Sequence, residues 1–363
     1  MMPATRGQIA VPLGAGRGSR AAGSRPPQEG DPLLGGVGTV RTMVTVDPLL
    51  NYRRFRFTSV DGTEIVGWTN DADGPPLLVC NGLGTPPEAW PRLLSEHPDY
   101  HVAGWNHRGG LGSDRPADPE RITVEDHVDD AFALMDAMGW DQAVVVGWSI
   151  GVNVAFEMAS QHPDRIAGVV ALAGVPGGTF EASFASLMVP KPLRRHVAMG
   201  VVQGGRLLGG PLTALAKAVP KGRNFAEVLR WSGFMMPHSN PDDAVPWIQA
   251  FLEHDFQWYF TLGVAAAKHQ PVDVSGVQVP VTIAAGGFDV MTSMRDVVAF
   301  AETIPHAVVH VLHGTHMLPL EFPDRIMDMI HDMFDKVTFE HQTPTSLGIG
   351  NEQRRSSPHS AAS

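Results

Sequence analysis

Short apolar runs alternate with helical segments through most of this chain, and this alternation restricts the fold more than any other feature. Residues 142–147 and 166–173 are nearly continuous apolar runs, which are typical of strands buried on both faces of a parallel sheet. Residues 150–161, between them, have the length and the apolar spacing of a helix. Strands joined by helices in this way form a mostly parallel sheet with helices on both faces. The sequence therefore predicts a doubly wound α/β fold.

The same alternation continues on both sides of this central unit. Further strands are expected at residues 54–58, 64–68, 77–80, 101–105, 279–284 and 307–312, and further helices at 123–138, 293–303 and 324–333. The first two strands flank Asp61 and Gly62, a residue pair typical of the turn in a β-hairpin. Thr123 can cap the first of these helices and Gly139 can end it.

The alternation is interrupted once, by a long segment in which short helical patterns are separated by Pro and Gly. This predicts a helical cap inserted into the α/β core. Both ends of the chain lack apolar periodicity and are rich in residues such as Gly, Ser and Arg, so we expect them to be disordered. The expected parts are a leader (1–45), a first core part (46–175), the cap (176–276), a second core part (277–338) and a tail (339–363). Met43 is an alternative start of the protein.

Composition excludes several classes of function. The net charge is −11, with no basic run, so nucleic acid is not an expected partner. No apolar stretch is long enough to span a membrane. The only cysteine, Cys80, ends an apolar run, which rules out a disulfide within the chain and fits a cytoplasmic protein. The sequence lacks His-Glu-x-x-His, and Pro86 and Pro87 occupy the turn that a dinucleotide site would need. We therefore expect no metal and no cofactor.

One pentapeptide carries chemistry. Gly147 to Gly151 reads Gly-Trp-Ser-Ile-Gly and matches G-x-S-x-G between an expected buried strand and an expected helix. A serine on so tight a turn exposes its hydroxyl, and the flanking glycines remove Cβ atoms that would clash. The helix that follows directs its N-terminal N–H groups toward the same place. Ser149 is therefore the candidate nucleophile.

A serine hydroxyl needs a base, because it is a weak nucleophile at neutral pH. Two histidines, His313 and His316, follow the last expected strand, and His316 is the better candidate because His313 still lies at the strand end. Asp289 follows the preceding strand, so its carboxylate can orient the imidazole. Parallel strands end at one edge of the sheet, which brings these positions near Ser149.

The order Ser149, Asp289, His316 resembles that of the α/β-hydrolase superfamily, from about residue 50 to 338. Asn81-Gly-Leu-Gly84 follows the third strand, where that family usually has His-Gly, and Asn106 to Asp114 resembles the family's next loop. The resemblance implies a capped serine hydrolase with an oxyanion hole formed by the backbone N–H groups of Leu83 and Ile150. The departure at Asn81 affects the shape of that hole and leaves the reaction class unchanged.

The resemblance implies a small-molecule ester or acyl substrate, cleaved through an acyl-enzyme. The Gly-Trp-Ser-aliphatic-Gly motif resembles carboxylesterases and the perhydrolase-like haloperoxidases, and thioesterase, lactonase and aminopeptidase activities are open alternatives. Trp148, Met317 and the cap residue Trp258 are the expected substrate contacts. Met and aromatic residues are frequent in the cap, which predicts an apolar pocket. The alternative is that most of these side chains pack the cap helices together, and for any single one of them this is the expected role.

Two further readings belong to other classes. Epoxide hydrolases and haloalkane dehalogenases share the fold but attack with a carboxylate, and Ser149 occupies that position. Epoxide hydrolases also use two cap tyrosines, whereas Tyr259 is the only tyrosine within the expected cap. The alternative to an enzyme is a ligand-binding protein built on a hydrolase fold, but none of the three triad residues is missing here.

Overall fold

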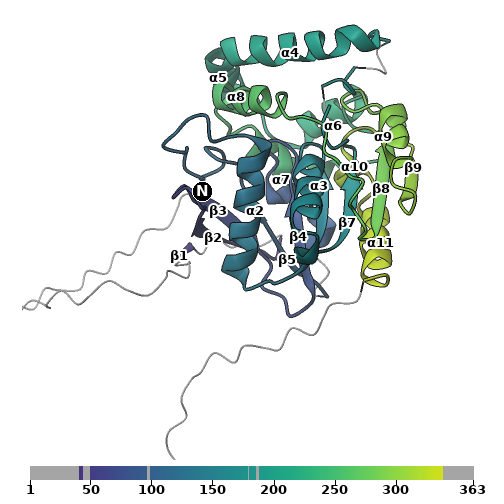
Figure 1. Cartoon of the computed structure of the whole chain (residues 1–363). Coiled ribbons are helices and arrows are strands. Elements are labelled where there is room, and N and C mark those ends of the chain that lie inside the picture. The colour runs from purple at the N-terminus through teal and green to yellow at the C-terminus, as the bar shows by residue number, and fades with distance from the viewer. Residues whose placement is uncertain (1–40, 44–49, 96–98, 179, 185–187, 338–363) are drawn as a thin grey trace, which may run out of the picture. The chain divides into compact units, whose positions relative to one another are not determined.

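Figure 1 shows a computed structural model of the chain, which describes residues 41–43, 50–95, 99–178, 180–184 and 188–337. The chain divides into two units, Met1–Gly36 and Val37–Ser363, and every described residue lies in the second. Most of the expected disordered leader and the whole expected tail lie outside the described residues. None of the described helices is long and apolar enough to cross a membrane.

The described strands form a single sheet with the order β1-β2-β3-β5-β4-β6-β7-β8-β9. The strands are β1 (Arg41–Met43), β2 (Arg53–Thr58), β3 (Glu64–Thr69), β4 (Pro76–Cys80), β5 (His101–Trp105), β6 (Ala143–Trp148), β7 (Ile166–Leu172), β8 (Val281–Gly286) and β9 (Val308–Leu312). The pairings β1–β2, β2–β3 and β3–β5 are antiparallel. The other pairings, from β5–β4 to β8–β9, are parallel. The predicted hairpin and the predicted mostly parallel sheet are therefore confirmed.

Helices cover both faces of this sheet. The core helices are α1 (Pro91–Ser95), α2 (Val124–Met138), α3 (Gly151–Gln161), α9 (Met294–Ala301), α10 (Leu318–Glu321) and α11 (Pro323–Phe334), with two 3-10 turns, η1 (Pro87–Ala89) and η2 (Pro163–Arg165). Apolar side chains of α2, α3 and α9 pack in one cluster, and those of α1 and α11 pack in another. The doubly wound α/β fold is thus confirmed.

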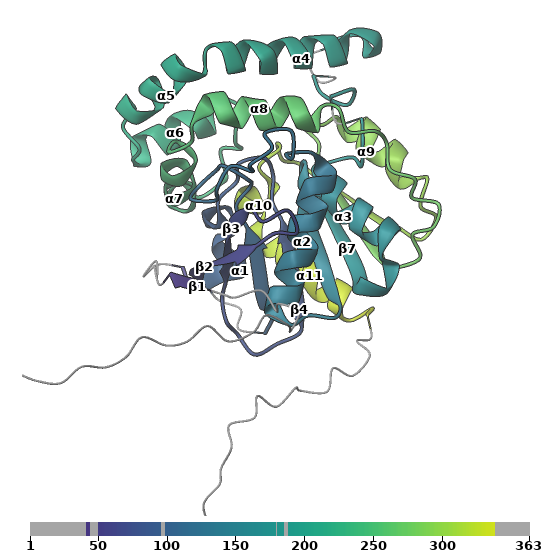
Figure 2. The same cartoon turned by 60° about the vertical axis from the view of Figure 1, so that its left-hand side comes forward.

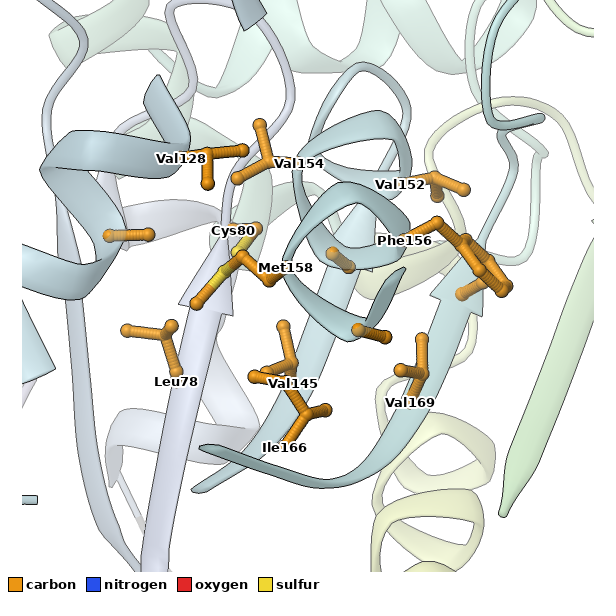
Figure 3. Packing of buried hydrophobic residues seen from close by; sticks show 14 of the residues in the cluster. Leu78, Cys80, Val128, Val145, Val152, Val154, Phe156, Met158, Ile166 and Val169 are labelled. Atoms are coloured by element: carbon orange, nitrogen blue, oxygen red, sulfur yellow. The ribbon is translucent and has the colours of Figure 1, made fainter. Parts of the chain in front are cut away.

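Strand β4 shows why the apolar runs are nearly continuous. Leu78 and Cys80 point into the first cluster, whereas Leu77 and Val79 point into the second, because successive side chains of a strand alternate between faces. Figure 3 shows Leu78 and Cys80 beside Met158 of α3 in the first cluster. Each residue of such a strand must be apolar, since neither face meets water.

Local signals also define α2. Thr123 is its N-cap and forms a capping box with Asp126, and Gly139 ends it in the left-handed conformation with φ 70°. These contacts satisfy backbone groups that a helix end leaves without partners. The predicted cap residue and end residue of this helix are both confirmed.

Strand β1 corrects the prediction of a leader that is disordered up to residue 45. Arg41, Thr42 and Met43 pair antiparallel with residues 54–56 of β2. An edge strand is held by backbone hydrogen bonds to its neighbour, so it needs no apolar periodicity of its own. The prediction rested on that periodicity and therefore missed the strand.

The segment between β7 and β8 contains five described helices, which we call the cap helices. They are α4 (Lys191–Leu207), α5 (Gly209–Ala218), α6 (Arg223–Trp231), α7 (Pro241–Phe251) and α8 (Phe256–Ala266). Figure 2 shows α8 between α4 and the sheet, with α4 and α5 on the outer side of the unit. The helices thus cover the edge of the sheet at which β6 ends.

Candidate active site

Ser149 lies on a strained turn between β6 and α3. Its φ is 56°, a left-handed backbone conformation that residues other than glycine rarely adopt. Its N–H donates to the Leu172 carbonyl at 2.9 Å. A Cβ on Gly151 would lie 1.9 Å from the Cys80 carbonyl oxygen, and one on Gly147 would lie 2.7 Å from the Gly151 oxygen. Both glycines of the motif are therefore needed for the backbone to pass through this turn.

Three side chains from three strand ends form a continuous hydrogen-bonded chain. His316 Nε2 lies 2.8 Å from Ser149 Oγ, and His316 Nδ1 lies 2.7 Å from Asp289 Oδ2. Because a carboxylate only accepts, Nδ1 carries the hydrogen, and Nε2 is then free to accept the serine proton. The structure thus brings the three predicted triad residues together in the predicted order.

The acid of this chain is itself held in place. Asp289 is buried, and its Oδ1 accepts the backbone N–H groups of Met291 at 2.7 Å and Thr292 at 2.8 Å. His313, the alternative base, is exposed and lies outside this hydrogen-bonded chain. The orientation of the carboxylate is therefore fixed before any substrate binds.

The loop after β4 lies directly against the serine. A Cβ on Gly82 would be 3.5 Å from Ser149 Cβ, and Leu83 and Ile150 line the same cavity as the serine. Asn81, which replaces the family's usual histidine, is buried and accepts the indole N–H of Trp90 at 2.7 Å. The asparagine therefore still anchors the turn that presents Leu83.

A cavity of about 200 Å³ opens at Ser149 under the cap helices. Its lining is mainly apolar and comes from the core loops and from α4 and α8. The lining residues are Leu83, Ser149, Ile150, Phe180, Ser183, Phe184, Ala198, Val201, Val202, Tyr259, Phe260, Gly263, Ala266, Met291 and Thr292. Burial raises the pKa of Tyr259 to about 12, which keeps its hydroxyl protonated.

The three expected substrate contacts lie elsewhere. Trp148 is buried, and its indole N–H donates to the His316 carbonyl at 2.9 Å. Met317 is also buried and packs in the second apolar cluster. Trp258 donates to the Arg108 carbonyl at 2.8 Å and stacks under Arg115. None of the three lines the cavity at Ser149, because neither adjacency to a triad residue nor a place in the cap sets the direction of a side chain.

Sequence reasoning missed His254, which lies between α7 and α8. Its Nε2 donates to the Gly84 carbonyl at 2.6 Å, so a cap loop is bonded to the loop that carries Leu83. Burial lowers the pKa of His254 and favours the neutral ring. The sequence holds sixteen histidines, so only the fold distinguishes this one.

A second, larger cleft of about 670 Å³ lies between the start of α4 and the loop before α9. Lys191, Arg194 and Phe288 are among its lining residues, but the serine is not. Volume alone would favour this cleft as the site. The smaller cavity is the one that contains the hydrogen-bonded triad.

One group of described residues has metal-ligating atoms close together. His269 lies between Glu125, 3.1 Å from Nδ1, and Glu157, 3.3 Å from Nε2. Each ring nitrogen faces a different carboxylate, so the imidazole bridges the two acids. The group links the end of the cap to α2 and α3, and it does not belong to the cavity.

The fold and this constellation define a hydrolase of the α/β type. A family model described as alpha/beta hydrolase fold matches residues 75–323, and the chain belongs to that family of hydrolases. The prediction of the superfamily is thereby confirmed.

Curated relatives differ in activity. A Caulobacter segnis protein named "Putative carbamate hydrolase RutD" is 34% identical over 32% of this chain and 44% of its own length. Epoxide hydrolase B of Mycobacterium tuberculosis is 30% identical over 38% of this chain and 40% of its own. This chain thus spans less than half of each of these proteins. The 3-oxoadipate enol-lactonase 2 of Acinetobacter baylyi is 25% identical over 78% of this chain and 91% of its own length.

Proposed function

We propose that this protein is a serine hydrolase that cleaves an ester or related acyl bond of a small, apolar substrate. Ser149 is the nucleophile, His316 the general base, and Asp289 the group that orients the imidazole. The observation that carries the proposal is the unbroken chain of hydrogen bonds, 2.8 Å and 2.7 Å long, from the serine hydroxyl to the buried carboxylate.

The reaction follows from this geometry. Ser149 Oγ attacks the acyl carbon while its proton passes to His316 Nε2, and Asp289 stabilises the imidazolium that forms. The carbonyl oxygen becomes an oxyanion and accepts the N–H groups of Leu83 and Ile150. Each such donor is typically worth about 3–4 kcal/mol in the transition state. His316 then gives its proton to the leaving group, and water releases the acid from Ser149 by the same steps.

The cavity supports an apolar acyl group. Its volume of about 200 Å³ and its mainly apolar lining suit an acyl chain of roughly hexanoyl size. Each buried methylene contributes about 0.8 kcal/mol. We therefore expect catalytic efficiency on p-nitrophenyl esters to rise from acetate towards hexanoate.

Lactone hydrolysis is the second candidate. The enol-lactonase relative aligns with 78% of this chain, and a lactone is a cyclic ester that the same triad can open. Carbamate, thioester, amide and peracid chemistry on this fold would also use Ser149. Epoxide hydrolysis is less compatible, because the attacking group here is a hydroxyl and not a carboxylate.

Labelling with a fluorophosphonate tests the proposal. Ser149→Ala should lose the label, whereas Ser183→Ala should keep it, because Ser183 lines the same cavity but has no place in the triad. Peptide mass spectrometry should locate the adduct on Ser149. Labelling that survives in Ser149→Ala would overturn the assignment of the nucleophile. Absence of labelling in the wild type would favour a ligand-binding protein.

Substrate class needs a separate screen. p-Nitrophenyl esters, acyl thioesters, lactones, carbamates and amino-acid amides should each be assayed with the wild type and with Ser149→Ala. Esters or lactones should give the highest kcat/KM. A clear preference for amides would contradict the proposed substrate class while leaving the triad intact.

A further inference from the structure

The outer helices of the cap expose an unusual amount of apolar surface. On α4, Leu193, Val197 and Val201 are 53%, 40% and 54% exposed, and their four-residue spacing aligns them in one stripe. Leu207 and Leu208 at the end of the helix are 82% and 59% exposed. Single exposed apolar residues are ordinary, but a continuous patch marks an interaction surface.

The charge of the same helices is opposite to that of the whole chain. The segment Lys191–Ala218 contains no Asp or Glu, although the chain has a net charge of −11. Its cations are Lys191, Arg194, Arg195, Arg206 and Lys217. Arg194 pairs with Asp296 and Arg195 with Glu181, both outside the segment.

Three of these cations remain for another partner. Lys191, Arg206 and Lys217 are exposed, and none of them forms an ion pair with a described residue. Lys217 acts on Glu253 only from a distance, where it contributes to lowering the pKa of that carboxyl. Lys191 and Arg206 also line clefts on the flanks of α4, away from the stripe, and long cationic side chains in such positions can extend past a helix to negative groups.

The opposite face of α4 lines the catalytic cavity. Ala198 and Val202 contribute to its wall, and Val201 belongs both to the wall and to the exposed stripe. Figures 1 and 2 show α4 lying outside α8 in both views. If the outer face of α4 were bound to a surface, an apolar molecule that left this surface would need to pass only α4 before it reached Ser149.

We propose that the outer face of α4 and α5 docks in the plane of an anionic lipid–water interface. Amphipathic helices with Lys or Arg beside Leu and Val bind such interfaces through apolar burial and attraction to anionic headgroups. A second copy of this chain is a poorer occupant. A symmetric contact would place each patch against itself and bring its unpaired cations together without any acid to neutralise them.

Docking on lipid goes beyond the proposed hydrolysis and does not depend on it, since binding can be measured with Ser149→Ala and no substrate. Co-sedimentation with phosphatidylcholine vesicles, with and without phosphatidylglycerol, is the assay. The full chain should sediment with the anionic vesicles at about 0.1 M salt and much less at about 1 M, where the Debye length falls to about 3 Å. Failure to bind the anionic vesicles, or equal binding to both kinds, would overturn the proposal.

Two sets of variants separate charge from apolar burial. The triple variant Lys191→Gln, Arg206→Gln, Lys217→Gln should lower binding about a hundredfold, at about fivefold for each cation. Leu207→Gln with Leu208→Gln should also weaken binding, by more than tenfold. The result that supports the proposal is a loss of lipid binding with unchanged turnover of a water-soluble ester.

Matched controls lie outside the cap. Val60→Gln removes an apolar side chain that is 70% exposed in the β2–β3 turn, and Lys336→Gln removes an exposed cation after α11. Neither should change binding, and an equal loss in these controls would mean that the attraction is not specific to α4 and α5. Light scattering completes the test. The protein could instead form a dimer, fail to bind lipid, and lose the dimer in the double variant Leu207→Gln with Leu208→Gln. That result would assign the surface to a second copy of the chain and overturn the proposal of lipid docking.

Discussion

His254 Nε2 lies 2.6 Å from the carbonyl oxygen of Gly84, and this single hydrogen bond connects the α7–α8 loop of the cap to the loop after β4. Gly84 has a φ of 64°, and a Cβ there would lie 2.8 Å from the ring of Tyr259. The β4 loop is thus pressed against the cap on the residue next to Leu83. The proposed oxyanion donor at Leu83 therefore depends on a cap residue for its position.

Replacing His254 tests this dependence. His254→Ala should lower kcat on a p-nitrophenyl ester by about 10- to 100-fold with a smaller change in KM, since a misplaced oxyanion donor weakens mainly the transition state. The Gly84 carbonyl would also lose its partner, at a cost of about 1–3 kcal/mol in unfolding free energy. His196→Ala, at an exposed histidine of α4, is the matched control. Unchanged kcat in His254→Ala would show that the β4 loop holds its shape alone.

The acid of the triad has its own test. Asp289→Asn should lower kcat by about 10⁴, because an amide in this place favours the wrong tautomer of His316. The N–H groups of Met291 and Thr292 can still donate to the amide oxygen, so the fold should survive and the melting temperature should change little. His313→Ala removes the exposed neighbouring histidine and should cost less than a few-fold. A larger loss of kcat in His313→Ala than in Asp289→Asn would show that His316 has been wrongly assigned as the base.

Two buried histidines predict how stability depends on pH. Burial, and then the neighbouring His127, hold the pKa of His107 well below its ordinary value, and burial also lowers that of His254. In the unfolded chain a histidine binds a proton near pH 6.5. Below that pH the unfolded state therefore binds more protons than the folded state, and the unfolding free energy falls as the pH falls.

Urea unfolding at pH 6.5 and pH 5.5 measures this loss. His107, whose pKa is held well below its ordinary value, should contribute a loss of about 1 kcal/mol between these two values, and His254 a loss in the same direction. His107→Asn has no proton to gain there, so its loss should be smaller than that of the wild type by about that amount, whatever its absolute stability. His313→Asn, at an exposed position, is the matched control. An unaltered slope in His107→Asn would mean that this ring binds a proton as readily in the folded state as in the unfolded state.

The ends of the strands can be predicted from the sequence, but the packing of the cap helices and the side chains that line the cavity cannot. Strands β6, β8 and β9 are apolar runs followed by Ser149, Asp289 and His316, and parallel strands must end at one edge, so the meeting of these three follows from their order. The cavity wall does not follow in this way. Val202 lines it because of how α4 crosses α8, a contact between helices that no local pattern encodes. The prediction that Trp148 contacts substrate also lacked a local signal for the direction of its side chain, since its indole N–H donates to the His316 carbonyl and the ring does not line the cavity.

The last prediction concerns how the cavity limits the length of the acyl group. Gly263 of α8 lies at its wall, and a Cβ there would stand 3.1 Å from Val202 Cγ1 and 3.5 Å from Leu83 Cδ2. Glycine at this position therefore keeps open the space between α4 and the β4 loop. A larger side chain would occupy volume that we assign to the acyl chain.

Gly263→Val should therefore move the optimum on p-nitrophenyl esters from about hexanoate towards acetate or butyrate. Each methylene that no longer fits forfeits about 0.8 kcal/mol, or roughly fourfold in kcat/KM. Fluorophosphonate labelling with a small probe should persist, because it requires the triad and not the acyl pocket. Gly200→Val is the matched control, since a Cβ on that glycine of α4 meets nothing within 4 Å. If Gly263→Val retains the wild-type order of ester preference, the acyl chain lies outside this cavity. The substrate would then reach Ser149 from another side of the cap.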